Sequence, residues 1–487
     1  MAETLILHKA DDVAVQVVKG AVPVGHKIAR HAIPAEAPVR KFGQIIGVAM
    51  EDIAAGAHVH SHNLGMAPHD AEFENTLAAA RAAIPDVAPR HFMGYARPDG
   101  RVGTRNSIAL CATVNCSATV IRCAASELLA EGALDPFPEV QTIAAFAHGS
   151  GCGMSGVGEG AAILERTLWG HATHPNVGAA IFVGLGCEVM QVERMKARMG
   201  GGDNVAFLTI QENGGTRATI DAIKARVCAV LPRVGAARRT SCPASELVVG
   251  LQCGGSDGLS GITANPALGI ASDLLVGMGG TVLLSETPEI FGAEQLLLSR
   301  ATSPEVAEAL RDRIAWWLAY AERHGTNLDN NPSPGNKLGG LTTILEKSLG
   351  AVAKAGATPL AGVCGYAERA PAQGLVFMDS PGFDPVSATG QIAAGAQIVC
   401  FTTGRGSAFG SKPAPTIKLA SNDALMERMG DDMDIGCGDV LRGVPLADKG
   451  LEILERILAV ASGGVTKSEA LGLGDHEFVP WQVGAVL

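Results

Sequence analysis

Aromatic side chains are scarce in this chain of 487 residues: 13 Phe, 4 Trp and 3 Tyr make up only 4% of it. Proteins that stack nucleic-acid bases need exposed aromatic rings, and proteins that bind the phosphate backbone need clustered Lys and Arg. Here 49 acidic residues outnumber 38 basic ones, and the net charge is −11. The composition therefore argues against a nucleic-acid partner.

Long apolar runs are also absent. The longest stretch free of Asp, Glu, Lys and Arg that we find, residues 167–187, is diluted by His, Asn, Pro and Gly, whereas a membrane span would be purer. The N-terminal sequence MAETLILHKADD carries acids where a signal peptide would carry positive charge. We therefore expect a cytoplasmic protein with no membrane partner.

The cysteines do not form a disulfide framework, because their number is odd, 11, and no CxxC pair occurs. Glycine is abundant instead, with 61 residues, as in a chain with many tight turns. Cys152 (HGSGCGM), Cys187 (GLGCE) and Cys253 (LQCGGSDG) stand in glycine-rich segments. Such segments suit redox, metal-binding or nucleophilic thiols. The alternative is that each is a small buried hydrophobic residue.

The pattern of apolar residues divides the chain into three domains. Residues 1–70 hold short alternating segments typical of a small β-rich domain, and residues 71–91, with the Ala-rich helical pattern EFENTLAAARAAI, read as a linker. Residues 92–239 and 240–487 alternate short apolar strands with longer helical segments, which predicts α/β domains with largely parallel sheets. Ligands of such sheets bind at the carboxyl ends of the strands.

The segment AHVHSHN places His58, His60 and His62 at alternate positions. On a strand these imidazoles project from one face, where two of them can bind one metal ion. An incidental cluster on a solvent face is the alternative. His26 and Lys27, in VGHKIA, belong to the same small domain.

Several glycine-framed loops carry polar side chains that could bind a substrate. Arg105 and Asn106 could clamp a carboxylate, or belong to a surface hairpin, and His148, at a strand end, is a plausible acid–base group. The segment QCGGSDGLSGITANPALG is rich in hydroxyl and amide groups that could surround a polyhydroxylated ligand. The substrate-binding candidates in this and two later loops are Ser256, Asp257, Asn265, Lys337 and Arg405.

Two generic motifs occur, but they give little evidence of function. GCGMSG fits GxGxxG without a following ribose-binding acid, and GGSDG fits a nucleophile elbow at Ser256, but both can arise by chance in so glycine-rich a chain. There is no Walker motif and no HExxH. Nucleotide-driven chemistry and zincin proteolysis are disfavoured.

Taken together, the motifs resemble the altronate and galactarate dehydratases over nearly the whole chain. The resemblance rests on GHK and VHSHN, GYARPDGRVGTRN, VNCS, GLGCE, CPASELVVGLQCGGSDGLSGITANPALG, NPSPGNKLGGLTTILEKSLG and FTTGRGSAFG. It implies a small β-rich N-terminal domain like the SAF (antifreeze-like) module, followed by two α/β dehydratase domains.

The resemblance also implies a metal-dependent dehydration of a sugar acid to a 2-keto-3-deoxy acid, usually with Fe²⁺, and Mn²⁺ is the other candidate ion. A divalent cation stabilises the doubly charged intermediate that follows loss of the α-proton. We expect His26, His60 and His62 to bind the metal. His148 and Lys27 are our candidates for base and acid, and Arg105, Lys337 and Arg405 for the substrate clamp.

Three alternatives stay open. An iron–sulfur cluster on Cys116, Cys152, Cys187 and Cys253 competes with the mononuclear ion, because four thiolates are the usual complement of a cluster. A related lyase releases sulfite from sulfolactate. A sugar-acid-binding protein could also retain the scaffold without the chemistry. We expect a small sugar acid as the partner, and the composition permits a homo-oligomer.

Overall fold

The computed structural model describes residues 3–67, 84–199, 204–484 and 486. Residues 72–83 of the predicted Ala-rich helix lie outside the described residues. Within the described part no helix is long and apolar enough to cross a membrane.

The N-terminal domain is a pair of small antiparallel sheets, as its alternating pattern predicted. One sheet has the order β1-β2-β3-β6 and the other β4-β5-β7. Their core is made by the inward residues Val13, Val39, Ile46 and Val59. The strands are β1 (Thr4–Leu5), β2 (Val13–Gln16), β3 (Lys27–Ala29), β4 (Pro38–Lys41), β5 (Gln44–Ala49), β6 (His58–Val59) and β7 (Leu64–Gly65).

The second domain is a four-stranded parallel sheet of order β11-β10-β12-β13. Its strands are continuously apolar because both faces are covered: α1 and α4 pack on one, α2 and α3 on the other. The elements are β10 (Ser107–Ala112), α1 (Asn115–Ala130), β11 (Ile143–Phe146), α2 (Glu159–Ala172), β12 (Val177–Gly184), α3 (Val192–Met199), β13 (Val205–Thr209) and α4 (Thr216–Val234). A small antiparallel sheet of β8 (His91–Ala96), β9 (Val102–Gly103) and β14 (Thr240–Pro243) joins the two ends of this domain.

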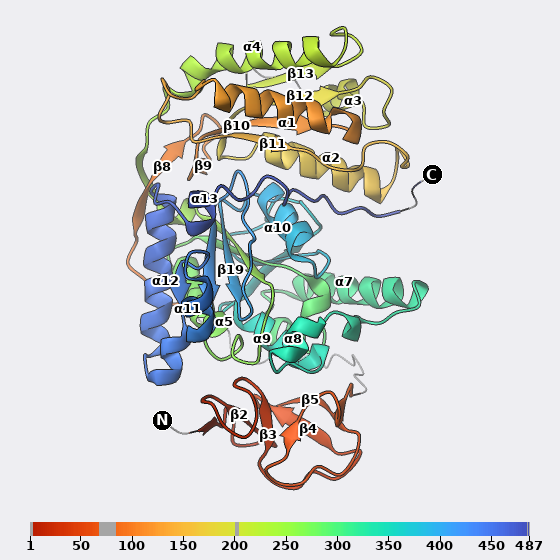
Figure 1. Cartoon of the computed structure of the whole chain (residues 1–487), viewed down its shortest axis with the longest axis vertical. Coiled ribbons are helices and arrows are strands. Elements are labelled where there is room, and N and C mark those ends of the chain that lie inside the picture. Colours follow the sequence, from red (N-terminus) through yellow and green to blue (C-terminus); the bar gives the residue numbers. More distant parts are fainter. Residues whose placement is uncertain (1–2, 68–83, 200–203, 485, 487) are drawn as a thin grey trace.

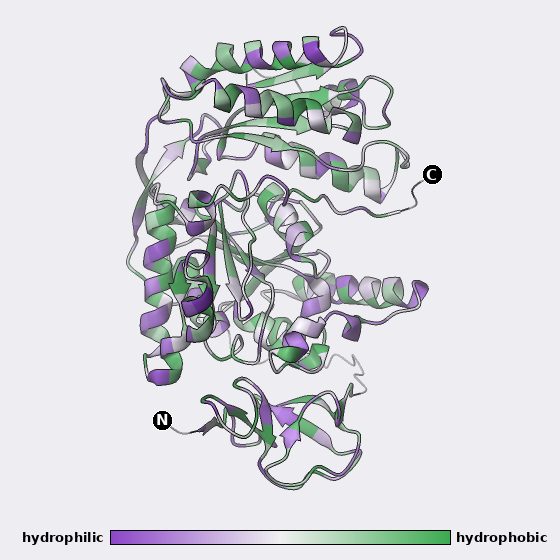
Figure 2. Cartoon of the chain, in the orientation of Figure 1, coloured by the Kyte–Doolittle hydropathy of each residue, from purple (hydrophilic) through white to green (hydrophobic). Residues whose placement is uncertain are grey.

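The C-terminal domain has a seven-stranded parallel sheet of order β17-β18-β16-β15-β19-β20-β21. The strands are β15 (Val248–Cys253), β16 (Thr281–Leu284), β17 (Leu360–Cys364), β18 (Gly374–Met378), β19 (Ile398–Thr403), β20 (Thr416–Ala420) and β21 (Ile435–Gly436). The main helices are α5 (Ala264–Gly277), α7 (Pro304–Arg323), α9 (Ile344–Ala353), α10 (Asp384–Ala393) and α12 (Leu446–Ala461). Figure 2 shows apolar residues gathered in the strands and on the inner faces of the helices.

The strand order indicates where a ligand can bind at the edge of this sheet. From β15 the chain continues to β16 on one side, whereas β19 and β20 extend the sheet on the other. Ligands of open parallel sheets bind in the crevice at the carboxyl ends where the order reverses. In this domain that crevice lies between the ends of β15, at Cys253, and β19, at Thr403.

The other two domains occupy opposite edges of the sheet (Figure 1). Gln397, just before β19, donates a hydrogen bond to the carbonyl of Val102, so the second domain lies at the amino edge. Gly258, just after β15, contacts Gly25, so the N-terminal domain covers the carboxyl edge. The N-terminal domain therefore covers the crevice.

Candidate functional site

A buried ion-pair triad fastens the N-terminal domain to the C-terminal domain. The ammonium groups of Lys27 and Lys41 lie 2.7 and 2.8 Å from the two carboxylate oxygens of Glu346, in the first turn of α9. All three side chains are almost completely buried. Burial lowers the pKa of Lys27 to about 8, although Glu346 opposes this, and the two lysines hold the pKa of Glu346 well below its usual value against its burial.

Close main-chain contacts at glycine residues also hold the N-terminal domain against the C-terminal domain. Gly25 has a φ of +85°, and its carbonyl is so close to Gly258 that a Cβ there would lie 1.9 Å away. A Cβ on Gly340 would lie 2.4 Å from the same carbonyl. Only glycine permits such an approach, so these glycines set the distance between the N-terminal domain and the crevice.

Four imidazoles gather at this interface. The ring centroids of His26, His58 and His60 lie 5.0 to 5.3 Å apart, and His62 lies 5.5 Å from His58. The Nε2 atoms of His26 and His60 donate hydrogen bonds to the carbonyls of Leu338 and Lys337, at 3.2 and 2.8 Å. The C-terminal domain therefore orients imidazoles that the N-terminal domain carries.

This arrangement fits a metal ion at His26 and His58. The His26 bond to Leu338 leaves a lone pair on Nδ1, which accepts a hydrogen bond from Nε2 of His58 at 3.0 Å, and a metal ion would take the place of that proton. Two nitrogens bound at right angles to one ion, each at about 2.1 Å, would be about 3.0 Å apart. Carbonyls that hold the far ring nitrogen are the usual support of a metal-binding histidine. Burial lowers the pKa of His26, His58 and His60, that of His58 to about 4 with help from its neighbours, so these rings are neutral. In this structure both nitrogens of His60 are hydrogen-bonded, to the Lys337 carbonyl and the Ser61 hydroxyl, so the expected ligand His60 is not free to bind.

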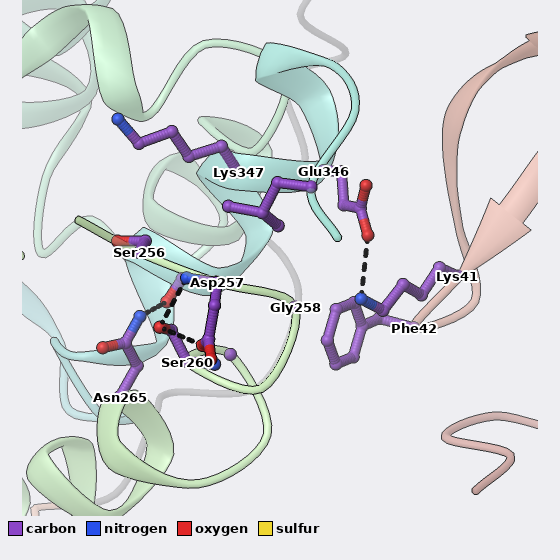
Figure 3. Close-up of a pocket in the computed structure, with 12 residues that line it drawn as sticks. Lys41, Phe42, Ser256, Asp257, Gly258, Ser260, Asn265, Glu346 and Lys347 are labelled. Carbon is purple, nitrogen blue, oxygen red and sulfur yellow. Dashed lines mark hydrogen bonds and ion pairs between the residues drawn. The ribbon is translucent and has the colours of Figure 1, made fainter. Parts of the chain in front are cut away.

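A small cavity lies beside this interface, at the carboxyl end of β15 (Figure 3). In this closed arrangement it has room for about one water molecule, ≈ 10 Å³. Glu346 and Lys347 point in opposite directions from α9, the first toward the N-terminal domain and the second into the C-terminal domain. The other polar side chains that line it are Lys41, Ser256, Asp257, Ser260 and Asn265.

Asp257 organises the loop that follows β15. One carboxylate oxygen accepts hydrogen bonds from the main chain and hydroxyl of Ser260 and from the hydroxyl of Ser421, and the other accepts one from Asn422. Asn265 bonds to Gly350 and Thr402. Of the described residues that line the cavity, Ser256 alone has a buried polar side-chain atom, its hydroxyl, with no hydrogen-bond partner.

Behind the cavity lies a second polar cluster, completely enclosed by the C-terminal domain. Cys253, Glu286 and Glu289 bring one ligand atom each within 4.8 Å of one another. Lys354 lies 2.9 Å from the Cys253 sulfur and 3.7 Å from Glu286, and Lys347 lies 2.7 Å from Glu289. Burial raises the pKa of Cys253 to about 12, and burial and Glu289 raise that of Glu286 well above its usual value.

Glu286 is the unusual member of this cluster. It has a left-handed φ of 72°, it is 0% exposed, and within the described structure neither of its carboxylate oxygens has a hydrogen-bond partner. A thiol and two carboxylates fit a divalent transition metal as donors. The two lysines already supply positive charge there, so a cation would have to displace Lys354 from the sulfur.

The structure separates the predicted catalytic and clamp residues into two groups. Ser256, Asp257 and Asn265 line the cavity, the Lys337 carbonyl holds His60, and Arg405 lies exposed in the loop after β19, where its amide donates to Gly255. Lys27 is in the interface, bound to Glu346 and to the carbonyl of Gly340.

The second group lies outside this site. Arg105 binds the carboxylate of Glu469 and several carbonyls, so the carboxylate that it clamps belongs to the protein itself. Asn106 is buried among main-chain and side-chain partners of the second domain. His148 lies at the end of β11, with Nε2 donating to the carbonyl of Ala112 and Nδ1 accepting from the amide of Ser150. His148 belongs to the second domain and the histidine cluster to the N-terminal domain, and these two domains lie on opposite sides of the C-terminal domain (Figure 1).

The four cysteines of the alternative cluster do not meet in this structure. Cys253 is buried in the C-terminal domain, in contact with Lys354 and Glu289. Cys116, Cys152 and Cys187 are exposed and belong to the second domain. A cluster with all four thiolates is therefore not assembled.

The sequence analysis missed several residues of the site. His58 was recognised in the alternating triad but was left out of the expected ligand set. Glu346 and Lys347 stand on α9 and Lys354 is its C-cap residue, and only the burial of this helix in the folded chain identifies them as part of the site. Glu286 and Glu289 do stand out in the sequence, in SETPEIFG directly after an apolar strand, but taken singly this segment could equally be a turn.

Comparison with known proteins covers all three domains. Residues 9–67 match the altronate/galactarate dehydratase SAF domain, residues 94–235 the D-galactarate dehydratase/altronate hydrolase second domain, and residues 244–486 the D-galactarate/altronate dehydratase C-terminal domain.

Individual relatives resemble the chain over most of its length. It is 36% identical to an altronate dehydratase of Bacillus subtilis over 93% of this chain and 90% of that protein. It is 35% identical to the galactarate dehydratase (L-threo-forming) of Escherichia coli, over 91% and 86%. It is also 34% identical to the beta subunit of a (2R)-sulfolactate sulfo-lyase of Chromohalobacter salexigens, over 81% and 98%.

Proposed function

The chain belongs to the altronate/galactarate dehydratase family, a family of sugar-acid hydro-lyases, and we propose that it removes water from altronate or galactarate to give the 2-keto-3-deoxy acid with a divalent metal ion. The observation that carries the metal assignment is the pair His26 and His58, whose facing nitrogens lie 3.0 Å apart beside the crevice. Fe²⁺ is the proposed ion and Mn²⁺ the alternative.

A bound divalent ion would act as a Lewis acid on the substrate carboxylate and 2-hydroxyl, which makes the α-proton more acidic. His26 and His58 would hold that ion, and His60 is held beside them by the Lys337 carbonyl. These imidazoles are neutral at neutral pH because their pKa values are lowered.

The cavity residues would position the rest of the substrate. The unpartnered hydroxyl of Ser256 offers a hydrogen bond to a sugar hydroxyl, whereas the Lys41 and Lys347 ammonium groups are already paired with Glu346 and Glu289. Because the closed cavity has room for about one water, the N-terminal domain has to move away before a sugar acid can enter. Its closure then excludes solvent from the reaction.

Proton transfer needs one group that accepts the α-proton and one that protonates the leaving hydroxyl. Lys27, one of our two candidates for proton transfer, is held as an ammonium by Glu346 in this closed arrangement, and it would have to leave that ion pair to act as the base. Glu286 is the proposed acid, since its raised pKa keeps it protonated and within the described structure its carboxyl oxygens have no hydrogen-bond partner. An acid–base role for His148 remains a prediction that this geometry does not support.

The second candidate function is release of sulfite from sulfolactate, favoured by the similarity to the beta subunit of that lyase. Both eliminations begin with loss of a proton next to a carboxylate, so the same site could serve either. In this chain the SAF domain and the dehydratase domains form one polypeptide, as in the sugar-acid enzymes matched over more than 90% of the chain.

The test is turnover by the full-length chain, purified without oxygen and loaded with Fe²⁺ or Mn²⁺. Altronate, galactarate and sulfolactate are offered separately, and 2-keto-3-deoxy acid and sulfite are measured. Keto-acid formation from either sugar acid, abolished by a chelator and restored by the ion, supports the proposal. Sulfite from sulfolactate alone, or turnover without the ion, contradicts it.

A further inference from the structure

Three exposed thiols stand at one edge of the second domain, apart from the proposed dehydratase site. Of the 11 free cysteines only Cys116, Cys152, Cys187 and Cys228 are exposed, and the first three follow neighbouring strands. Cys116 comes after β10, Cys152 after β11 and Cys187 after β12, and these strands are adjacent and parallel. Their carboxyl ends therefore present all three thiols at the same edge.

Hydrogen bonds lock the three loops together. The Asn115 amide donates to the carbonyl of Ser150, which ties the Cys116 turn to the Cys152 loop. The amides of Val189 and Met190 both donate to the carbonyl of Gly151, which ties the Cys187 loop to the same place. Gly151, with a φ of +96°, is so close to β10 that a Cβ on it would lie 2.1 Å from the Thr113 carbonyl.

Two buried side chains hold these loops in place. Glu188, 3% exposed, accepts a hydrogen bond from the Thr113 hydroxyl with one oxygen and from the Gly186 amide with the other. His148, buried and with its pKa lowered to about 4 by burial, bridges the Ala112 carbonyl and the Ser150 amide as a neutral ring. Both residues therefore act as positioning groups for the cysteine loops.

Two of the sulfurs lie beside hydrogen-bond donors. Cys116 is the second residue of α1, whose first turn has no side-chain cap and no acid, so its amide dipoles favour negative charge. The amide nitrogen of Gln211 lies 3.7 Å from the Cys187 sulfur as a donor. Exposed thiols without a function are a liability in a protein surface, and three at one edge need an explanation.

The positions of the three cysteine sulfurs limit the kind of metal centre that they can bind together. Among the described residues no group of three or more metal-ligand atoms within 4.8 Å of one another includes these sulfurs, so they are not drawn together around a single ion. A polynuclear cluster places several metal atoms and sulfides between its thiolates. Thiolates on separate loops are the usual ligands of iron–sulfur clusters.

We propose that Cys116, Cys152 and Cys187 hold an iron–sulfur cluster of the [4Fe–4S] type at the carboxyl edge of the second domain. The three thiols lose their protons to solvent when the cluster binds. Since four thiolates are the usual complement, one iron lacks a protein thiolate and is open to an oxygen ligand such as water or a hydroxy acid. This centre is separate from the proposed histidine site.

The experiment uses the full chain, purified without oxygen and reconstituted with Fe²⁺ and sulfide. Iron, acid-labile sulfide and visible absorbance are measured for the wild type, C152S, the triple variant C116S/C152S/C187S and the control C228S, whose thiol is exposed on α4. We expect about four iron and four sulfide per chain in the wild type and C228S, and at least a tenfold loss of sulfide in the other two. Circular dichroism checks that all four are folded.

Wild-type protein without sulfide overturns the proposal, whether it holds zinc, iron alone or a disulfide between these cysteines. Equal sulfide in the triple variant overturns it as well. A double variant H26A/H58A separates this proposal from the proposed function: it should keep its sulfide and absorbance while keto-acid formation is lost. Sulfide retained with no turnover in the wild type would contradict the dehydratase and leave the cluster standing.

Discussion

The ammonium of Lys27 lies 2.7 Å from the carboxylate of Glu346, 319 residues further along the chain, and both side chains are 0% exposed. A charge buried in this way is stable only with its partner, because either group alone would remain desolvated and uncompensated. The contact therefore fixes the N-terminal domain over the crevice of the C-terminal sheet, and the site depends on it.

Replacing Glu346 with Gln should remove the negative charge between Lys27 and Lys41. Breaking a buried pair by removing one partner costs about 3–5 kcal/mol. We expect a loss of this size in the free energy of unfolding, or separate unfolding of the N-terminal domain, measured by urea denaturation of the full chain.

The control for that change is Glu455→Gln, since Glu455 pairs with Arg90 at 2.8 Å but both side chains are largely exposed. Exposed pairs contribute at most about 1 kcal/mol. If Glu346→Gln and Glu455→Gln destabilise the chain equally, the triad does not hold the domains together.

Replacing Gly258 with Ala should push the N-terminal domain away from the crevice, because the new Cβ would meet the Gly25 carbonyl at 1.9 Å. A displacement of about 1 Å at a reacting site can lower turnover about 100-fold. We expect such a loss of kcat, with little change in the circular dichroism spectrum. Gly149→Ala is the matched control, since a Cβ there meets nothing within 4 Å; equal losses in both variants would refute this account of docking.

Glu286 and Glu289 should respond differently to the same chemical change. Glu286→Gln resembles the protonated form that its raised pKa favours, so stability should change by less than about 1 kcal/mol while turnover falls at least about 100-fold. Glu289→Gln removes the partner of Lys347 and should cost about 3–5 kcal/mol. Urea denaturation and keto-acid assays measure both; full activity in Glu286→Gln would exclude it as the acid.

The histidine cluster should make stability depend on pH in a definite direction. The pKa of His58 is lowered to about 4 from 6.5, so between these values the unfolded chain binds a proton that the folded chain does not. Stability should therefore fall as pH falls from about 6.5 to about 4. His148 and His171, with pKa values also lowered to about 4, contribute the same way, so the informative quantity is the difference between wild type and His58→Gln.

That difference is measured by urea denaturation at several pH values. The decline on acidification should be shallower in His58→Gln than in the wild type. Parallel curves would show that His58 titrates normally and is not held among its neighbours.

Much of the architecture follows from the sequence because hydrophobic periodicity is local. The alternating strands of the N-terminal domain and the continuously apolar β10, β12, β15 and β19 appear where the pattern predicts them. The assignment of the substrate loop after β15 rests on the same logic, since strand ends of a parallel sheet collect ligands.

What the sequence did not reveal depends on contacts between distant segments. Arg105 looks like a substrate clamp until Glu469, 364 residues away, is seen to occupy it. His148 looks like an acid–base group until both ring nitrogens are found bound to the main chain. Conversely, Glu346 looks like a surface acid and is the centre of the domain contact, because nothing local in the sequence shows that α9 is buried.

The measurement that tests the central claim most directly is metal-dependent turnover of altronate and galactarate by the wild type, H26A/H58A and H31A. His31 belongs to the same domain and its side chain is 57% exposed, so its loss should leave metal binding unchanged. The account predicts that wild type and H31A bind Fe²⁺ and form keto acid, and that H26A/H58A binds the ion at least about 100-fold more weakly and forms none. Unchanged Fe²⁺ affinity and turnover in H26A/H58A would contradict it and move the metal to Cys253, Glu286 and Glu289.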